Sequence, residues 1–234
     1  MSITSLKASE SRAGSVKKKS KDTKKNNALD HSDWIDAARS ILIDDGVGGL
    51  SLRRISAQLN ATTGAFYWQF ANLEKLLDDL REDWNTRNSA AFDRVFKDPG
   101  LDGLERYIGY VRILLREEEY DPKYDSAMRD WAHSCAKTRT VVAHVDNRRV
   151  AQLQALFAEL GFGQKSARVR AMMTYFHQSG YYQMNIDETL EERLANIPYY
   201  AEIMVGPDFF PPDLTIKELR RLIFDNEAED GSSD

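Results

Sequence analysis

The feature that most constrains the fold is a helical repeat of apolar residues that begins near residue 31 and continues almost to the end of the chain. Apolar side chains recur three and four positions apart, as in Ile35, Ala38 and Leu42, which places them on one face of a helix. No segment shows the alternation of apolar and polar residues that a half-buried strand requires. The chain is therefore predicted to be all-α.

Capping residues and breaks divide this repeat into separate helices. A first helix is expected over about 32–45, ended by Gly46 in a left-handed conformation. Ser51, Thr62 and Asn72 are residue types that cap helix N-termini, so a further helix should follow each of them. The remaining helices are expected near residues 101–119, 123–137, 138–160, 165–185, 188–204 and 213–225, with breaks that contain Gly or Pro between or within them.

Composition narrows the class of protein. Hydrophobic residues make up 42% of the chain, enough for a real core, yet no apolar run approaches the ~18 residues of a membrane span. The basic N-terminus lacks the apolar stretch of a secretory signal. The single Cys135 excludes an internal disulfide, which fits a reducing compartment. A cytoplasmic protein without membrane contact is therefore expected.

Charge is distributed unevenly along the chain. The net charge is −5, but residues 1–30 hold eight Lys and Arg against three Asp and Glu, an excess of five positive charges. This segment has few large apolar residues, so it is expected to be a disordered basic arm. Such an arm can assist DNA binding, or it can serve only as a solubilising tail.

Two short helices joined by a tight turn, with a supporting helix before them, form an arrangement that fits the major groove of DNA. On the second short helix Phe66 and Phe70 should face inward. None of the residues expected to face outward is charged, so direct base recognition would use hydroxyl groups, a methyl group against thymine and aromatic edges. These outward residues are Thr62, Thr63, Ala65, Tyr67 and Trp68. Arg53 and Arg54 are suitably placed for phosphate contacts.

The stretch from Trp34 to Leu80, above all SLRRISAQLNATTGAFYWQFANLEKLLDDL, resembles the DNA-binding domain of the tetracycline-repressor (TetR) family. The resemblance implies that Tyr67 holds a backbone phosphate and that Trp68 and Gln69 touch the DNA backbone or a base. It also implies that Thr62, Thr63 and Ala65 approach bases. The full set of expected DNA-binding residues is Ser51, Arg53, Arg54, Thr62, Thr63, Ala65, Tyr67, Trp68, Gln69 and Lys75.

Three positions depart from the family's pattern. Asn60 stands where a turn glycine is usual, and asparagine tolerates the left-handed conformation. Gln69 replaces a histidine and keeps a hydrogen-bond donor. Leu73 replaces a lysine and removes one phosphate contact, for which Lys75 or the basic arm could compensate.

The rest of the chain is similar to the same family more loosely, in stretches such as Asp130-Trp131-Ala132. The resemblance implies a helical regulatory domain with a cavity for a small-molecule effector, for which Tyr110, Trp131 and Phe176 are the expected ligand-binding residues. It also implies a homodimer formed by long antiparallel helices. The expected dimer contacts are Leu153, Phe157, Met172 and Tyr175.

Together these features predict a basic arm over residues 1–30, a helix-turn-helix domain over 31–80, and a helical ligand-binding and dimerisation domain over 81–234. The expected function is a transcriptional regulator of double-stranded operator DNA, commonly a repressor that a small-molecule inducer releases. Two alternatives stay open. Leu73 favours a protein-interaction module with a degenerate helix-turn-helix, and a helical enzyme would need a converging polar cluster.

No catalytic residue, metal site or cofactor is expected. His133 and Cys135 lie two positions apart and therefore on different faces of a helix, which argues against a shared metal. His144 and His177 have no neighbouring ligand at a suitable spacing.

Overall fold

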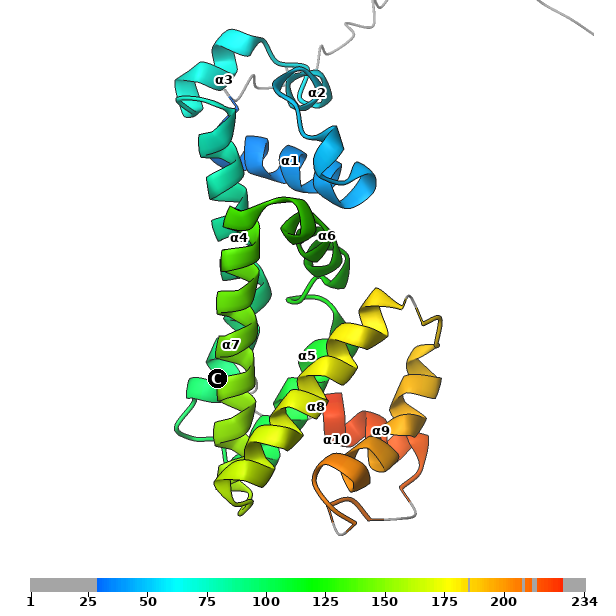
Figure 1. Ribbon diagram of the computed structural model, residues 1–234. Coiled ribbons are helices and arrows are strands. Elements are labelled where there is room, and N and C mark those ends of the chain that lie inside the picture. Colours follow the sequence, from blue (N-terminus) through cyan, green and yellow to red (C-terminus); the bar gives the residue numbers. More distant parts are fainter. Residues whose placement is uncertain (1–28, 185, 208, 212–213, 225–234) are drawn as a thin grey trace, which may run out of the picture.

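A computed structural model describes residues 29–184, 186–207, 209–211 and 214–224. These residues form ten α-helices and no strand, so the predicted all-α class is confirmed (Figure 1). The basic arm lies outside the described residues as far as residue 28. The helices are α1 (His31–Asp45), α2 (Leu52–Gln58), α3 (Thr63–Gln69), α4 (Leu73–Lys97), α5 (Gly103–Arg116), α6 (Pro122–Ser134), α7 (Ala136–Glu159), α8 (Gln164–Gln183), α9 (Leu190–Met204) and α10 (Ile216–Phe224).

Local capping fixes where the first four helices begin. The side chains of Ser51, Thr62 and Asn72 accept hydrogen bonds from the backbone N–H three residues further on, at 3.3, 3.2 and 2.9 Å. The three predicted caps are thereby confirmed. Helix α1 begins slightly earlier than expected, because Asp30 and Asp33 cap it reciprocally.

The helices build an elongated molecule (Figure 1). The long helices α4 and α7 lie against each other, and α8 packs along α7. Helices α1, α2 and α3 form one end, with α6 between them and the remainder. Helices α9 and α10 lie at the other end, where α10 packs against α5 and α9. No helix of the described chain is long and apolar enough to cross a membrane.

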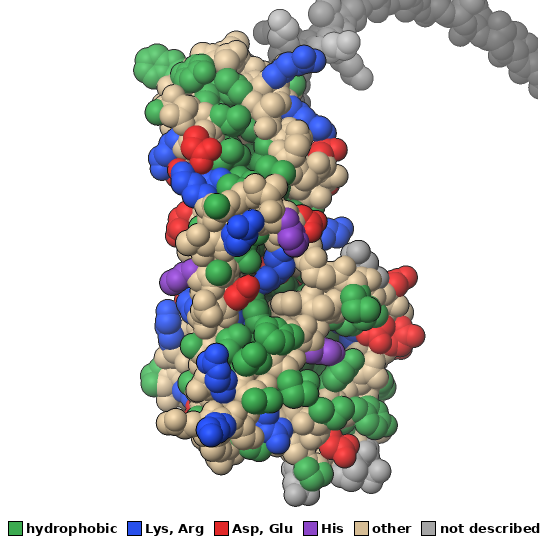
Figure 2. Space-filling model, viewed as in Figure 1, with side chains coloured by type: hydrophobic (Ala, Val, Ile, Leu, Met, Phe, Trp, Pro, Cys, Tyr) green, Lys and Arg blue, Asp and Glu red, His purple; other side chains and the backbone are tan. Residues whose placement is uncertain are grey.

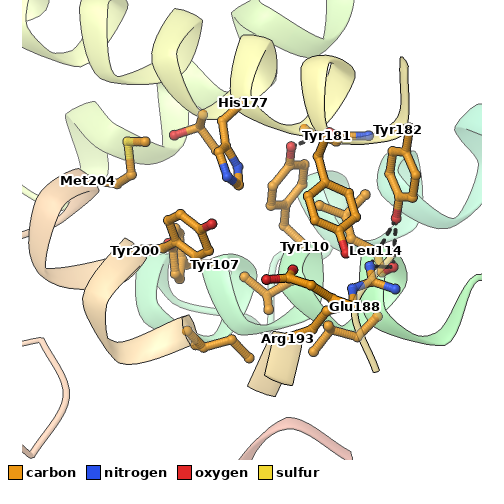
Figure 3. Close-up of a pocket in the computed structure, with 15 residues that line it drawn as sticks. Tyr107, Tyr110, Leu114, His177, Tyr181, Tyr182, Glu188, Arg193, Tyr200 and Met204 are labelled. Carbon is orange, nitrogen blue, oxygen red and sulfur yellow. Dashed lines mark hydrogen bonds between the residues drawn. The ribbon is translucent and has the colours of Figure 1, made fainter. Parts of the chain in front are cut away.

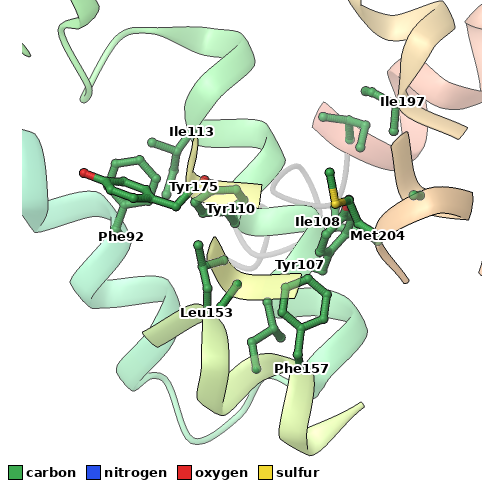
Figure 4. Packing of buried hydrophobic residues seen from close by; sticks show 14 of the residues in the cluster. Phe92, Tyr107, Ile108, Tyr110, Ile113, Leu153, Phe157, Tyr175, Ile197 and Met204 are labelled. Carbon is green, nitrogen blue, oxygen red and sulfur yellow. The ribbon is translucent and has the colours of Figure 1, made fainter. Parts of the chain in front are cut away.

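Buried side chains form two hydrophobic clusters. The N-terminal core joins α1, α2, α3, the first half of α4, α6 and the start of α7, and it includes Trp34, Phe66 and Trp84, all fully buried. The C-terminal core joins the second half of α4 with α5, α7, α8, α9 and α10 (Figure 4). Phe157 is buried at its centre.

Helix α4 continues without a break through residue 80, where a domain boundary was expected. Leu80 and Trp84 both belong to the N-terminal core, and Tyr124 of α6 donates a hydrogen bond to the Leu80 carbonyl at 2.8 Å. The helix-turn-helix is therefore built onto α4 and α6 rather than joined to them by a linker.

Candidate nucleic-acid interface

The turn between α2 and α3 has the geometry that the sequence predicts. Asn60 adopts a left-handed conformation with φ of 50°. After it, the Ala61 N–H donates to the Ser56 carbonyl at 2.8 Å, which closes the turn. Asn60 thus adopts the left-handed conformation for which the family's pattern has a glycine, because asparagine is one of the few other residues that adopt it readily.

Aromatic packing holds the inner side of α3. Phe66 is fully buried; its ring meets the Trp34 ring edge-on with centroids 5.4 Å apart and stacks on Phe70 at 5.3 Å. The predicted inward pair of Phe66 and Phe70 is confirmed. The rings fix the rotation of this short helix about its own axis, so its outer side chains have a fixed direction.

The outer side of α3 is open to solvent and carries two large aromatic residues. Tyr67 is 59% exposed and Trp68 is 89% exposed. Thr63 and Gly64 lie on the same exposed surface. In Figure 2, hydrophobic side chains gather at the end of the molecule that α3 forms. We call Thr63, Gly64, Tyr67 and Trp68 the recognition face.

One predicted member of this face points elsewhere. Ala65 is half-buried against the N-terminal core, so its side chain is not directed outward as expected. The exposed position is Gly64, which is not among the predicted DNA contacts. A Cβ at Gly64 would meet only the Thr62 hydroxyl at 3.7 Å, so packing within the chain does not require glycine there. In the sequence, a glycine inside such a short helix is itself an indication that the position faces a close partner rather than the core.

Most of the expected phosphate-binding cations are engaged within the chain. Arg54 forms an ion pair with Asp45, and the Lys75 ammonium lies 2.5 Å from Asp79. Arg53 is exposed and has no ion-pair partner among the described residues. Exposed ion pairs are worth little, so Arg54 and Lys75 can exchange their carboxylates for phosphates at small cost.

Two other predicted DNA contacts have local structural roles. The Gln69 amide donates to the Leu29 carbonyl at 3.1 Å, which ties the end of α3 to the segment before α1. The Ser51 hydroxyl accepts the cap hydrogen bond of α2. Both residues remain exposed, but each would have to combine DNA contact with its present bond.

A cavity of about 110 Å³ lies between α5, α8 and α9 (Figure 3). Of the three expected ligand-binding residues, Tyr110 lines it and the other two do not. Trp131 is buried in the N-terminal core, beneath the Arg81 guanidinium at 4.4 Å. Phe176 is 58% exposed on the outer surface of α8, because the inner face of α8 there is formed by Tyr175 and Gln178.

The expected dimer contacts also need correction. Leu153, Phe157 and Tyr175 are buried in the core of this same chain, which leaves them no side-chain surface for a partner. Met172 is half-buried. The exposed apolar residues of α8 instead form a stripe at helical spacing, made of Val169, Met173 and Phe176. Helix α9 exposes two more large residues, Tyr199 and Ile203.

Comparison with known proteins identifies the N-terminal part. Residues 35–80 match the model of the family described as bacterial regulatory proteins, tetR family. No curated protein matches the sequence.

Solved structures share the fold. A TetR transcriptional regulator from Legionella pneumophila has a TM-score of 0.57 at 13% identity, over 76% of this chain and 95% of that one. A transcriptional regulator from Rhodococcus sp. Rha1 has a TM-score of 0.56 at 15% identity, over 77% and 94%. A transcriptional regulator of the TerR/AcrR family from Aquifex aeolicus VF5 has a TM-score of 0.53 at 15% identity, over 74% of this chain and 94% of that one. Residues 35–80 therefore form a helix-turn-helix domain of the tetR family of bacterial regulatory proteins, and the chain shares its fold with solved regulators of that kind.

Proposed function

We propose that this regulator is a homodimeric repressor that holds operator DNA with its two α3 helices and leaves it when a small molecule enters the cavity between α5, α8 and α9. The recognition face carries this proposal. Tyr67 and Trp68 are adjacent and exposed, and a contiguous exposed aromatic patch of this kind marks a binding surface. The major groove of DNA admits one α-helix, which suits a helix of this size.

Each residue of the recognition face has a chemical role in this proposal. The Thr63 hydroxyl meets a base edge, and Trp68 offers an apolar surface to a thymine methyl group. Gly64 allows the helix backbone to lie close to the DNA. Tyr67 donates its hydroxyl to a backbone phosphate, and Arg53, exposed and without an ion-pair partner among the described residues, adds a positive charge.

A dimer follows from what one recognition helix can bind. A single short, uncharged helix contacts too few base pairs for a stable specific complex, so two half-sites about one helical turn apart (~34–36 Å) are required. The exposed stripe of Val169, Met173 and Phe176 on α8 supports self-association, because it offers an apolar surface to a second copy.

A polar network gives the cavity a route to the DNA-binding end. Arg129 of α6 donates to Asp125 at 2.7 Å, to Asp146 of α7 at 2.9 Å and to the Tyr175 hydroxyl of α8 at 2.8 Å. Tyr175 is flanked on α8 by residues that line the cavity, while Trp131 on α6 is part of the N-terminal core. A ligand that shifts α8 would therefore move α6 and change the separation of the two α3 helices.

The experiment is selection of bound sequences from a random DNA pool in moderate salt, followed by affinity measurements on the selected site. Tyr67→Ala should weaken binding to every sequence by about tenfold, since a lost phosphate contact carries no sequence information. Tyr199→Ala is the matched control, because Tyr199 is 67% exposed but lies on α9. Failure to enrich any sequence would favour a protein-interaction module instead.

A further inference from the structure

Aromatic side chains dominate the cavity between α5, α8 and α9. Figure 3 shows the rings arranged around it, from helices on three sides. The imidazole of His177 lies with them, its centroid 4.3 Å from that of Tyr200. The tyrosines that line the cavity are Tyr107, Tyr110, Tyr181, Tyr182 and Tyr200.

Two charged residues reach this cavity, and only one of them is neutralised. The Arg193 guanidinium lies 2.7 Å from the Glu117 carboxylate and also donates to the Leu114 carbonyl at 2.7 Å and to the Tyr182 hydroxyl at 3.1 Å. Glu188 accepts a hydrogen bond from the Asn196 amide at 3.1 Å and another from the Tyr181 hydroxyl. No Lys, Arg or His of the described chain forms an ion pair with Glu188.

The remaining polar groups are neutral. Burial of its ring lowers the pKa of His177, so this residue supplies no positive charge at neutral pH. Tyr107 is 3% exposed and its hydroxyl has no hydrogen-bond partner among the residues that the structure describes. Among the described residues, the cavity therefore combines tyrosine faces, one hydroxyl without a hydrogen-bond partner and one carboxylate without a counter-charge. The Arg193 guanidinium already lies over the rings of Tyr181 and Tyr182, 5.3 and 5.9 Å from their centroids, so the open faces are those of the other tyrosines.

We infer that the cavity binds an aromatic organic cation, with the positive group beside Glu188 and the ring among the tyrosines, an inference that rests on the proposed effector function. The negative faces of tyrosine rings attract a cation, and they do so more strongly where water is excluded. A carboxylate without a counter-charge adds a direct charge interaction. A neutral phenol would gain neither, and an anion would be repelled by Glu188.

The test is calorimetric titration of the full chain, without DNA, with three probes of similar shape. Benzyltrimethylammonium carries the positive charge, neopentylbenzene is its neutral isostere, and phenylacetate is negative. The cation should bind at least about tenfold more tightly than the isostere, and phenylacetate should not bind. Glu188→Gln should remove that preference, because it keeps the shape of the side chain and removes its charge.

Glu191→Gln is the matched control, since Glu191 is exposed at the start of α9 and does not line the cavity. It should retain the wild-type preference for the cation. Equal binding of the cation and its isostere, or an unchanged preference in Glu188→Gln, would overturn the inference, and so would failure of the cation to bind. None of these results affects the proposed operator binding, which is measured without ligand.

Discussion

The two cores of this protein differ in how completely they are filled. In the N-terminal core, Trp34, Phe66 and Trp84 are fully buried, and the short helices α2 and α3 that contribute to this core are each capped at the N-terminus. The C-terminal core encloses the tyrosine-lined cavity, where Tyr200 is half-buried and the Tyr107 hydroxyl has no hydrogen-bond partner among the described residues. Close packing transmits displacement but permits little adjustment, whereas an unfilled space can change volume.

This difference in packing suits the two proposed tasks, DNA recognition at one end and effector binding at the other. The recognition face must keep a fixed direction, so the core behind it leaves α3 no freedom to rotate. An effector site needs room for a ligand, so the protein gives up packing contacts there. The polar network around Arg129 lies between the two cores and joins α6, α7 and α8.

The largest expected effect is on stability. Phe66→Ala should lower the free energy of unfolding by about 3–5 kcal/mol, because it leaves a cavity in a filled core. Tyr200→Ala should cost only about 1 kcal/mol, since that ring already borders empty space. Urea unfolding of both variants measures the difference.

Trp68→Ala is the control within α3. Trp68 is 89% exposed, so its loss should change stability by no more than about 0.5 kcal/mol while weakening DNA binding. If Tyr200→Ala destabilised the protein as much as Phe66→Ala, the contrast between a filled and a hollow core would be wrong.

The DNA-binding end could be predicted well from sequence because local chemistry specifies it. Ser51, Thr62 and Asn72 cap the helices that follow them, and Asn60 forms the turn, through contacts that span only a few residues. Those signals are visible in a short window of sequence. The family match on the same stretch also sets aside the helical-enzyme alternative, because tetR-family proteins are DNA-binding regulators.

The C-terminal part could be predicted only as helices, because α8 carries apolar residues on more than one face. Ala171 and Tyr175 turn toward the chain's own core, while Met173 and Phe176 turn away from it. Sequence spacing identifies both sets as apolar but cannot say which one meets a partner. That choice depends on how α7 and α9 are placed, which is why spacing alone predicts Phe176 in the cavity and Tyr175 at the interface.

A second prediction addresses the link between the cores. The Tyr175 hydroxyl donates to Asp146 at 2.6 Å and accepts from Arg129 at 2.8 Å. Tyr175→Phe should lower the free energy of unfolding by about 1 kcal/mol, because two partly buried polar partners lose a hydrogen bond. It should also reduce the change in operator affinity that benzyltrimethylammonium causes.

Tyr199→Phe provides the comparison for this loss, because its hydroxyl lies on an exposed side chain. Tyr199→Phe should match the wild type in its free energy of unfolding and in the change of operator affinity that benzyltrimethylammonium causes. A Tyr175→Phe protein that is destabilised yet responds fully to the cation would mean that coupling takes another route.

The smallest expected effect is a dependence on pH that arises in the hollow core. Burial lowers the pKa of His177, so the unfolded chain binds a proton at this residue more readily than the folded chain does. Folding is therefore disfavoured as the pH falls below about 6.5, the usual histidine value. His177→Gln should lose less stability than the wild type between pH 7.5 and 5.5, as measured by urea midpoints. The difference should be small, because His177 lies at the mouth of the cavity and its ring remains partly exposed. His144→Gln, at an exposed position on α7, should follow the wild type, and identical curves for all three proteins would contradict the prediction.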